Sequence, residues 1–402
     1  MGTSRLPLIA LAVTLVAWAV AALAGWQAHT APAYHLAITA LLAVGLYGST
    51  RGIELSELRE NLRTVVLAIT VGVLAKTALI SAVMYLIHPR PISLVLGVAV
   101  AQIDPLSVGA TLSRRMSDSA RAILSAWAAF DDPVTVLLTV YLSAFALGGE
   151  ASDGIADFWQ GLAFNGAFVL VAAGLWWLAR LLSKHITGVV RVVGAVVAVL
   201  LVAGFAVVSV RYGLMLGVAA CGLFFRPFRT LDWVVDRTLA AALLLAGAAL
   251  GVVLGGTVTT HSWPDLLRGL ALGGAAFAAQ MVMGVALSRH LPRYDRWCLA
   301  LGQQNGLTAI VLALLLEPDF PGAVAVIAPA VLVTNLLFAL GRRVLDRVPG
   351  GSSGEVAAVA AHMTATIAVP IPEPTADPTA EPEPPRQTGA VHKPWSAAPG
   401  SG

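Results

Sequence analysis

The sequence has few charged residues for its length. Only 12% of its 402 residues are Asp, Glu, Lys or Arg, whereas about a quarter of the residues of a soluble globular protein are charged. Hydrophobic residues make up 58% of the chain. Together these values exclude a soluble enzyme as the main body of the protein.

The sequence also has only two cysteines and a small net charge. Cys221 and Cys298 lie far apart in apolar stretches, so they form neither a CxxC motif nor a zinc-ligand spacing. The formal net charge of +3 is too small to indicate nucleic acid as a partner. The sequence contains no GxxxxGK(S/T) loop or other phosphate loop. We therefore expect no nucleotide and no cofactor.

Long apolar stretches dominate what is present. About 20 mostly apolar residues form a helix that crosses roughly 30 Å of hydrocarbon, where the backbone must be hydrogen-bonded within the segment. The sequence contains twelve such stretches, near residues 6–26, 33–50, 64–87, 92–112, 120–147, 157–182, 188–209, 211–225, 236–257, 264–288, 297–317 and 322–344. We predict an all-α integral membrane protein with about twelve transmembrane helices in a lipid bilayer.

Basic residues in the connecting segments predict the orientation of these spans. Three follow each even-numbered span: Arg51, Arg59 and Arg63; Arg114, Arg115 and Arg121; Arg180, Lys184 and Arg191; Arg226, Arg229 and Arg237; Arg289, Arg293 and Arg296; Arg342, Arg343 and Arg347. The opposite side has only Arg90, Arg211 and Arg268. Because cytoplasmic loops are enriched in Lys and Arg, both termini are predicted to be cytoplasmic, in a bacterial-type inner membrane.

The composition changes abruptly near Val348. Ten of the 22 prolines lie in the last 55 residues, in stretches such as Pro370-Ile-Pro-Glu-Pro, and apolar residues are few after Val369. Such a segment cannot bury a core. We expect residues 1–347 to form the transmembrane domain and residues 348–402 to form a disordered, Pro-rich cytoplasmic tail.

Four charged residues fall near the middle of their spans: Lys76, Asp104, Asp131 and Asp132. An Asp or Lys at a helix centre costs roughly 2.5–3.5 kcal/mol on insertion, so function or pairing must offset that cost. Asp131 and Asp132 are adjacent and cannot share one helix face. Two carboxylates this close repel each other in a low dielectric, and the pair is therefore suited to hold a proton or a small cation.

Two spans carry signals of a mid-membrane interruption. Asp104-Pro105 places a proline inside one span, where it removes a backbone donor, and Asp104 is expected to cap the half-helix that follows. The eleventh span has a polar, glycine-bearing interruption formed by Gln303, Gln304, Asn305 and Gly306.

Their positions suggest an inverted repeat. Spans 3–5 and 10–12 are two sets of three whose middle members are interrupted, and an offset of seven spans gives the two sets opposite topology. Transporters with inverted repeats bind their substrates between such interrupted helices. We therefore expect the two interrupted helices to cross at mid-membrane.

At this point the motifs resemble the monovalent cation/proton antiporter superfamily, which includes bacterial sodium/proton antiporters and the sodium/proton exchangers. The likeness extends over roughly residues 38–345. It is carried by GIEL at 52–55, Asp104-Pro105 with Gly109 behind it, Asp131-Asp132, and QNGLTAIVLALLL at 304–316.

The resemblance implies roles for the paired acids. The second acid, Asp132, corresponds to the main carrier of the ion and the proton, so the monovalent cation would bind there. The first acid, Asp131, is Asp in family members reported as electrogenic and Asn in electroneutral ones.

The resemblance also implies an elevator-like motion. A six-helix core, here 64–147 and 264–344, would slide past a dimerisation and linking domain, here 6–50 and 157–257, in a homodimer.

Two positions depart from the family pattern. Ile103 stands where the family usually has Thr, and its side chain forms no hydrogen bonds. Many members carry Lys or Arg in the tenth span, where this sequence has Gln280. Lys76 lies instead in span 3, the inverted-repeat equivalent of span 10, and we expect it to pair with Asp131 or Asp104. Inter-helix hydrogen bonding explains the uncharged polar residues Gln102, Asn165, Thr308 and Asn335 without a transport role.

The sequence thus favours a secondary active antiporter, not an enzyme, that exchanges H+ for Na+ or K+ at Asp132 and serves pH homeostasis. Three alternatives stay open. A sodium-coupled transporter of organic solutes has a related fold. An intramembrane aspartyl protease needs acids on different helices, which Asp104 with Asp132 would allow. A sensor would use the tail as its output.

Overall fold

The computed structural model describes residues 6–26, 31, 33–51, 62–105, 108, 115–147, 151–183, 214–224, 232–257, 263–302 and 306–347, with a few single positions between 193 and 208. The chain divides into two units, Met1–Ile367 and Ala368–Gly402, and every described residue belongs to the first. The predicted tail and most of the predicted span at 188–209 therefore lie outside the described residues.

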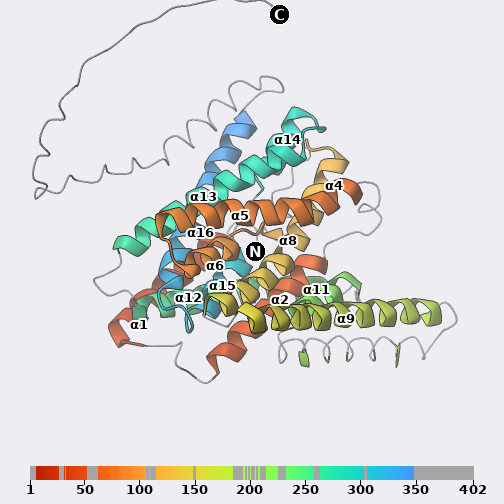
Figure 1. The fold of residues 1–402 in the computed structure, drawn as a ribbon, viewed down its shortest axis with the longest axis horizontal. Coiled ribbons are helices and arrows are strands. Elements are labelled where there is room, and N and C mark those ends of the chain that lie inside the picture. The colour runs from red at the N-terminus through yellow and green to blue at the C-terminus, as the bar shows by residue number, and fades with distance from the viewer. Residues whose placement is uncertain are drawn as a thin grey trace, which may run out of the picture. The chain divides into compact units, whose positions relative to one another are not determined.

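The described elements are helical. The longer ones are α1 (Leu6–Ala24), α2 (Tyr34–Arg51), α5 (Val73–Ile87), α8 (Asp118–Ala146), α9 (Ala151–Ser183), α12 (Asp232–Thr257), α13 (Trp263–Leu287) and α16 (Ala323–Arg347). The shorter ones are α4 (Leu62–Leu67), α6 (Pro91–Ala99), α11 (Met215–Phe224), α14 (Arg293–Ala300) and α15 (Leu307–Leu316), and the π-helical segment η3 (Ala68–Gly72) joins α4 to α5. Each predicted span other than 188–209 coincides with one or more of these helices (Figure 1).

Several of these helices can cross a membrane by length and composition. Within the described residues, six segments are long and apolar enough: Leu62–Ile87, Asp118–Ala146, Trp159–Leu178, Trp233–Gly256, Trp263–Leu287 and Ala323–Arg347. Shorter apolar helices cover Ile9–Ala24, Met215–Phe224 and Leu307–Leu316. Many large apolar side chains on these helices are exposed, as expected of surfaces that face lipid.

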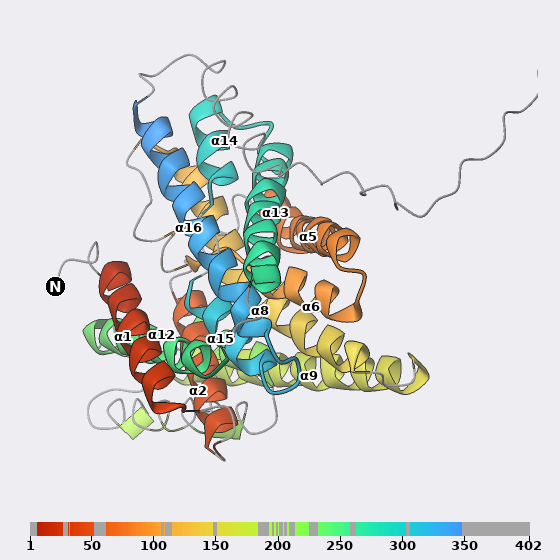
Figure 2. The ribbon, with the colours of Figure 1, turned by 90° about the vertical axis from the view of Figure 1, so that its left-hand side faces the viewer.

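Two spans are interrupted near their middle. α6 ends at Ala99, and the chain continues without helical geometry to Asp104. α14 ends at Ala300, and α15 begins only after Gly306. The residues of the first interruption are buried, which is the condition under which irregular backbone is tolerated at membrane depth. α6 and α15 contact each other and α8 (Figures 1 and 2).

Regularly spaced glycines bring α12 onto α1. Gly247, Gly251 and Gly255 recur every four residues and so share one face of α12. A Cβ atom at Gly251 or Gly255 would overlap the α1 backbone, at Thr14 and Trp18 respectively. Small residues at this spacing allow membrane helices to approach closely, so the α1–α12 contact depends on the absence of side chains.

Glycines also pack against the backbone of a neighbouring helix at other helix pairs. On α13, Gly269 and Gly273 lie against carbonyl groups of α16, and the two helices run side by side (Figure 2). Gly222 of α11 lies against the Tyr47 carbonyl of α2, and Gly97 of α6 lies against the Ser81 backbone of α5. These contacts join the helices in pairs with little room for added atoms.

We expect Gly251→Ala to lower the melting temperature of the detergent-solubilised protein, because the new methyl group must displace the α1 backbone and overpacking costs about 1–3 kcal/mol. Gly174→Ala on α9 is the matched control, because none of the described residues in contact range places an atom within 4 Å of its Cβ position. Equal melting temperatures for the two variants would contradict the close α1–α12 contact.

Candidate functional site

α8 carries the two adjacent acids. Ser117 caps its N-terminus by accepting a hydrogen bond from the backbone N–H of Ala120 at 3.2 Å. Further along the helix, Asp131 and Asp132 are 0% and 2% exposed. Because consecutive residues are about 100° apart around a helix, their carboxylates face different neighbours. Asp131 contacts α5, and Asp132 contacts α15.

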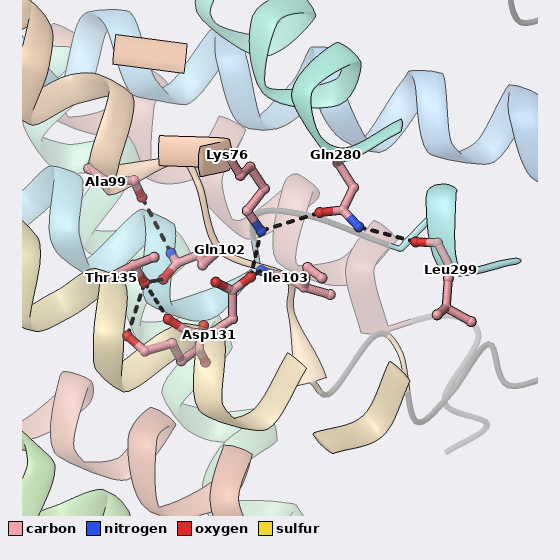
Figure 3. A network of polar contacts seen from close by, with 9 residues as sticks. Lys76, Ala99, Gln102, Ile103, Asp131, Thr135, Gln280 and Leu299 are labelled. Carbon is pink, nitrogen blue, oxygen red and sulfur yellow. Dashed lines mark hydrogen bonds and ion pairs between the residues drawn. The ribbon is translucent and has the colours of Figure 1, made fainter. Parts of the chain in front are cut away.

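Lys76 of α5 forms an ion pair with Asp131 (Figure 3). Its Nζ atom lies 2.6 Å from Asp131 Oδ2, and both side chains are fully buried. Of the two partners predicted for Lys76, Asp131 and Asp104, the structure therefore has Asp131 in direct contact. The backbone N–H of Ile103 donates to the same Oδ2 at 2.8 Å, so Ile103 takes part through its backbone. The Trp127 ring centroid lies 5.6 Å from the ammonium nitrogen.

Gln280, near the middle of α13, extends these contacts to the second interruption. Lys76 Nζ donates to Gln280 Oε1 at 3.2 Å, and Gln280 Nε2 donates to the Leu299 carbonyl at 3.1 Å (Figure 3). Leu299 lies in the last turn of α14, where carbonyl groups have no partner within the helix. A continuous series of contacts therefore runs from Ile103 in the first interruption to α14 beside the second.

Asp132 has different neighbours. The Thr308 hydroxyl, in the first turn of α15, donates to Asp132 Oδ2 at 3.0 Å. The Thr135 hydroxyl lies 2.9 Å and 3.0 Å from the main-chain carbonyl oxygens of Asp131 and Asp132. Within the described ranges, no salt bridge joins Asp132 to a basic side chain. Its charge is therefore not neutralised by a direct ion pair, unlike that of Asp131.

Asp104 brings the first interruption against the second. Its side chain is 8% exposed, and a Cβ atom at Gly306 would overlap its carboxylate. Only glycine leaves room for this approach. Since Gly306 immediately precedes α15, the carboxylate lies at the positive end of that half-helix, where a negative charge is favourable. The main-chain carbonyl of Asp104 accepts from Val108 N–H at 2.9 Å.

The predicted site residues are thus partly brought together. Pro105 directly follows the non-helical segment after α6, and Gly306 meets Asp104 as described. Gln303, Gln304 and Asn305 lie outside the described residues. The sequence predicts no transport role for Thr308, whereas in the structure its hydroxyl donates to Asp132. The feature of the sequence that could have indicated this contact is the position of Thr308, two residues after Gly306 in the first turn of the half-helix.

Two further buried acids have local partners. Glu317, at the end of α15, accepts from the backbone N–H groups of Gly322 and Val324 at 2.9 Å and 2.7 Å. Asp295 of α14 accepts from the backbone N–H and the hydroxyl of Ser117 at 3.2 Å and 2.6 Å. Glu317 thereby caps the start of α16, and Asp295 ties α14 to the start of α8.

A bundle of membrane-spanning helices in which two interrupted helices meet beside buried acids is an architecture of secondary transporters. The family model described as "Sodium/hydrogen exchanger, transmembrane" matches residues 41–342. The chain therefore belongs to the sodium/hydrogen exchanger family, and the resemblance to the cation/proton antiporter superfamily is confirmed.

A solved structure supports the fold. The sodium proton antiporter MjNhaP1 from Methanocaldococcus jannaschii, determined at pH 8, is similar with a TM-score of 0.60 at 18% sequence identity, over 87% of this chain and 98% of that chain. At this identity the likeness concerns the fold.

No curated protein matches the chain. The protein is thus an all-α integral membrane protein of a transporter family, and its membership supports cation/proton antiport as its activity.

We expect Lys76→Met to lower the melting temperature markedly, because removing one partner of a buried ion pair typically costs about 3–5 kcal/mol. The double variant Lys76→Met/Asp131→Asn should recover most of that loss, since it buries no unpaired charge. Melting curves of the single and double variants form a double-mutant cycle. Strictly additive effects would contradict a direct Lys76–Asp131 pair.

Proposed function

We propose that the protein exchanges H+ for Na+ or K+ across a bacterial-type inner membrane, with proton and cation competing for Asp132. The observation that carries this proposal is the contrast between the adjacent acids. Lys76 Nζ lies 2.6 Å from Asp131, whereas the hydrogen-bond partner of Asp132 Oδ2 is the neutral Thr308 hydroxyl. A buried ionised carboxylate without a counter-charge is costly, so a proton or a small cation is needed to neutralise Asp132.

Neutralisation of Asp132 couples loading to movement. Moving an ionised carboxylate through a region of low dielectric is expensive, whereas a carboxylate that carries a proton or a monovalent cation has no net charge. Alternating access then favours the loaded carrier in either direction. Each cycle exchanges one kind of ion for the other, and the protein requires no cofactor for this cycle.

We propose that the transmembrane domain consists of a moving core and a dimerisation and linking part. Residues 64–147 and 264–344 form the moving core, and residues 6–50 and 157–257 form the dimerisation and linking part of a homodimer. The glycine contacts support this division. In the linking part, glycines lie against the backbone of the neighbouring helix between α1 and α12 and between α11 and α2. In the core, they do so between α6 and α5 and between α13 and α16.

Glycines at the proposed boundary meet side chains rather than backbone, as Gly48 with Leu239 and Gly341 with Leu301 also do within the parts. Gly45 of α2 faces Leu307 and Thr308 of α15, and a Cβ atom there would meet only side-chain atoms, the nearest at 3.3 Å. Gly161 of α9 faces the Tyr141 side chain of α8 in the same way. Side chains can change rotamer as one surface passes another, while a backbone cannot yield. These contacts therefore suit a boundary at which the parts move.

The proposed orientation places both termini in the cytoplasm. The three basic residues that follow each even-numbered span support this assignment. It places the start of α2 and the end of α15 on the outer side. In agreement, the Tyr34 hydroxyl of α2 donates to the Leu314 carbonyl of α15 at 2.7 Å.

We expect Asp132→Asn to abolish cation-driven proton flux in proteoliposomes, because an amide binds neither a proton nor a cation in exchange. Flux after a pH jump, measured separately with Na+, K+ and Li+, tests the site and compares the cations. Asp236→Asn is the control, since Asp236 is an exposed acid near Arg51. Wild-type flux in Asp132→Asn would refute the assignment of this carboxylate.

Competition at one carboxylate also predicts how transport depends on pH. As the pH falls, protons occupy Asp132, so the apparent KM for Na+ should rise by about tenfold per pH unit in the acid limb. Saturating Na+ should restore the maximal rate. Initial rates over a range of Na+ concentrations at several pH values test this, and a KM that is independent of pH would argue against a shared site.

A further inference from the structure

Gln102 lies in the first interruption, two residues before Asp104, and its side chain is fully buried. The amide is close to groups of three elements: the end of α6, the acid-bearing turn of α8 and the first turn of α15. Gln102 is uncharged and lies outside the motifs that carry the family resemblance. Its position beside Asp132 makes it a candidate.

The neighbours of the amide determine its orientation. In the orientation drawn in Figure 3, Oε1 accepts from the Thr135 hydroxyl at 3.2 Å, and Nε2 is 3.5 Å from the Ala99 carbonyl. That orientation also turns Oε1 toward a carboxylate oxygen of Asp132 and Nε2 toward the backbone N–H of Ala309. An acceptor then faces an acceptor, and a donor faces a donor.

Turning the amide by 180° satisfies both ends. Nε2 then donates to Asp132 Oδ1 at 3.2 Å and to the Thr135 hydroxyl at 3.2 Å, and Oε1 accepts from Ala309 N–H at 2.5 Å. Ala309 lies in the first turn of α15, where backbone N–H groups have no partner within the helix. Amide orientation follows from such networks, so we assign Nε2 to the side of Asp132.

With this assignment, the two oxygens of Asp132 are bound from two different interrupted helices. Oδ1 accepts from Gln102, which belongs to the first interruption, and Oδ2 accepts from Thr308 of α15 at 3.0 Å. Both donors stabilise the ionised, unloaded carboxylate. A proton or cation that arrives at Oδ1 reduces the negative charge of that oxygen and so weakens its hydrogen bond with the Gln102 N–H.

We propose that Gln102 is a positioning residue that sets how tightly Asp132 binds its cation, by donating to the unloaded carboxylate and linking it to the start of α15. This inference rests on the proposed function, because it takes Asp132 as the binding group. Loading of Oδ1 weakens the acceptor for Nε2. The same amide holds Ala309 N–H, so the first turn of α15 responds to the occupancy of Asp132.

Two variants of similar length separate this role from a purely structural one. Gln102→Met loses both the donor and the acceptor. Gln102→Glu keeps an acceptor for Ala309 N–H but replaces the N–H that faces Asp132 with a carboxylate oxygen. Gln160→Met, on the exposed surface of α9, is the matched control.

The measurement is the apparent KM for Na+ in proteoliposomes at alkaline pH, where proton competition is weakest. Hydrogen bonds to charged groups are strong enough that losing one changes a binding constant by about tenfold or more. We expect KM to fall by about tenfold in Gln102→Met and further in Gln102→Glu, because a second carboxylate attracts the cation. Gln160→Met should leave KM unchanged.

Other results would overturn the inference. A normal KM in Gln102→Glu beside a defective Gln102→Met would mean that Gln102 only caps α15. A KM that rises in Gln102→Met would mean that the amide oxygen is a ligand of the cation. An unchanged KM in both variants would show that the amide has no influence on Asp132. Asp132→Asn in the same assay tests the proposed function separately, because its retention of flux would refute the site itself.

Discussion

Within the hydrocarbon region, a carboxylate needs a group that neutralises it or donors that stabilise its charge. The arrangement around α8 follows from this constraint. Asp131 is neutralised by Lys76, and the pair is held between the backbone of Ile103 and the side chain of Gln280. Asp132 receives hydrogen bonds from neutral groups. One of the two adjacent acids thus has a buried counter-charge, and we propose that the other binds an exchangeable one.

The interruptions of the two helices provide the groups that this arrangement needs. Within a continuous α-helix, the backbone N–H and C=O groups hydrogen-bond to each other. Only the groups at its ends are available to bind a charged side chain. Ile103 N–H binds Asp131, and the Leu299 carbonyl holds Gln280. The start of α15 receives the Asp104 carboxylate, and Gly306 permits this approach because it has no side chain. The breaks in the two helices therefore expose backbone groups that bind polar and charged side chains.

Glycines pack against neighbouring helices in two ways, and the proposed motion would make use of the difference. Where glycine meets a neighbouring backbone, as between α1 and α12, the contact has no freedom to slide. Where α2 faces α15, the contact is made by side chains, together with the Tyr34–Leu314 hydrogen bond near one end. The proposed motion of the core against the linking part would take place at this contact. Thr308 lies next to it, because its hydroxyl donates to Asp132 and would lie 3.7 Å from a Cβ atom at Gly45 of α2.

The class of protein, most of the spans and the four charged residues near mid-span could be predicted from the sequence alone. Hydrophobic length, proline, glycine and charges at mid-span act locally, so their consequences are visible without a fold. The pairing of Lys76 with Asp131 and the positions of Thr308 and Gln102 beside Asp132 become visible only in the folded structure. These contacts join residues up to 176 positions apart. The position of an uncharged polar residue, even one in the first turn of a half-helix such as Thr308, does not by itself predict a contact with an acid, because hydrogen bonding between helices satisfies many such residues. Which of these residues meets an acid depends on how the two interrupted helices cross.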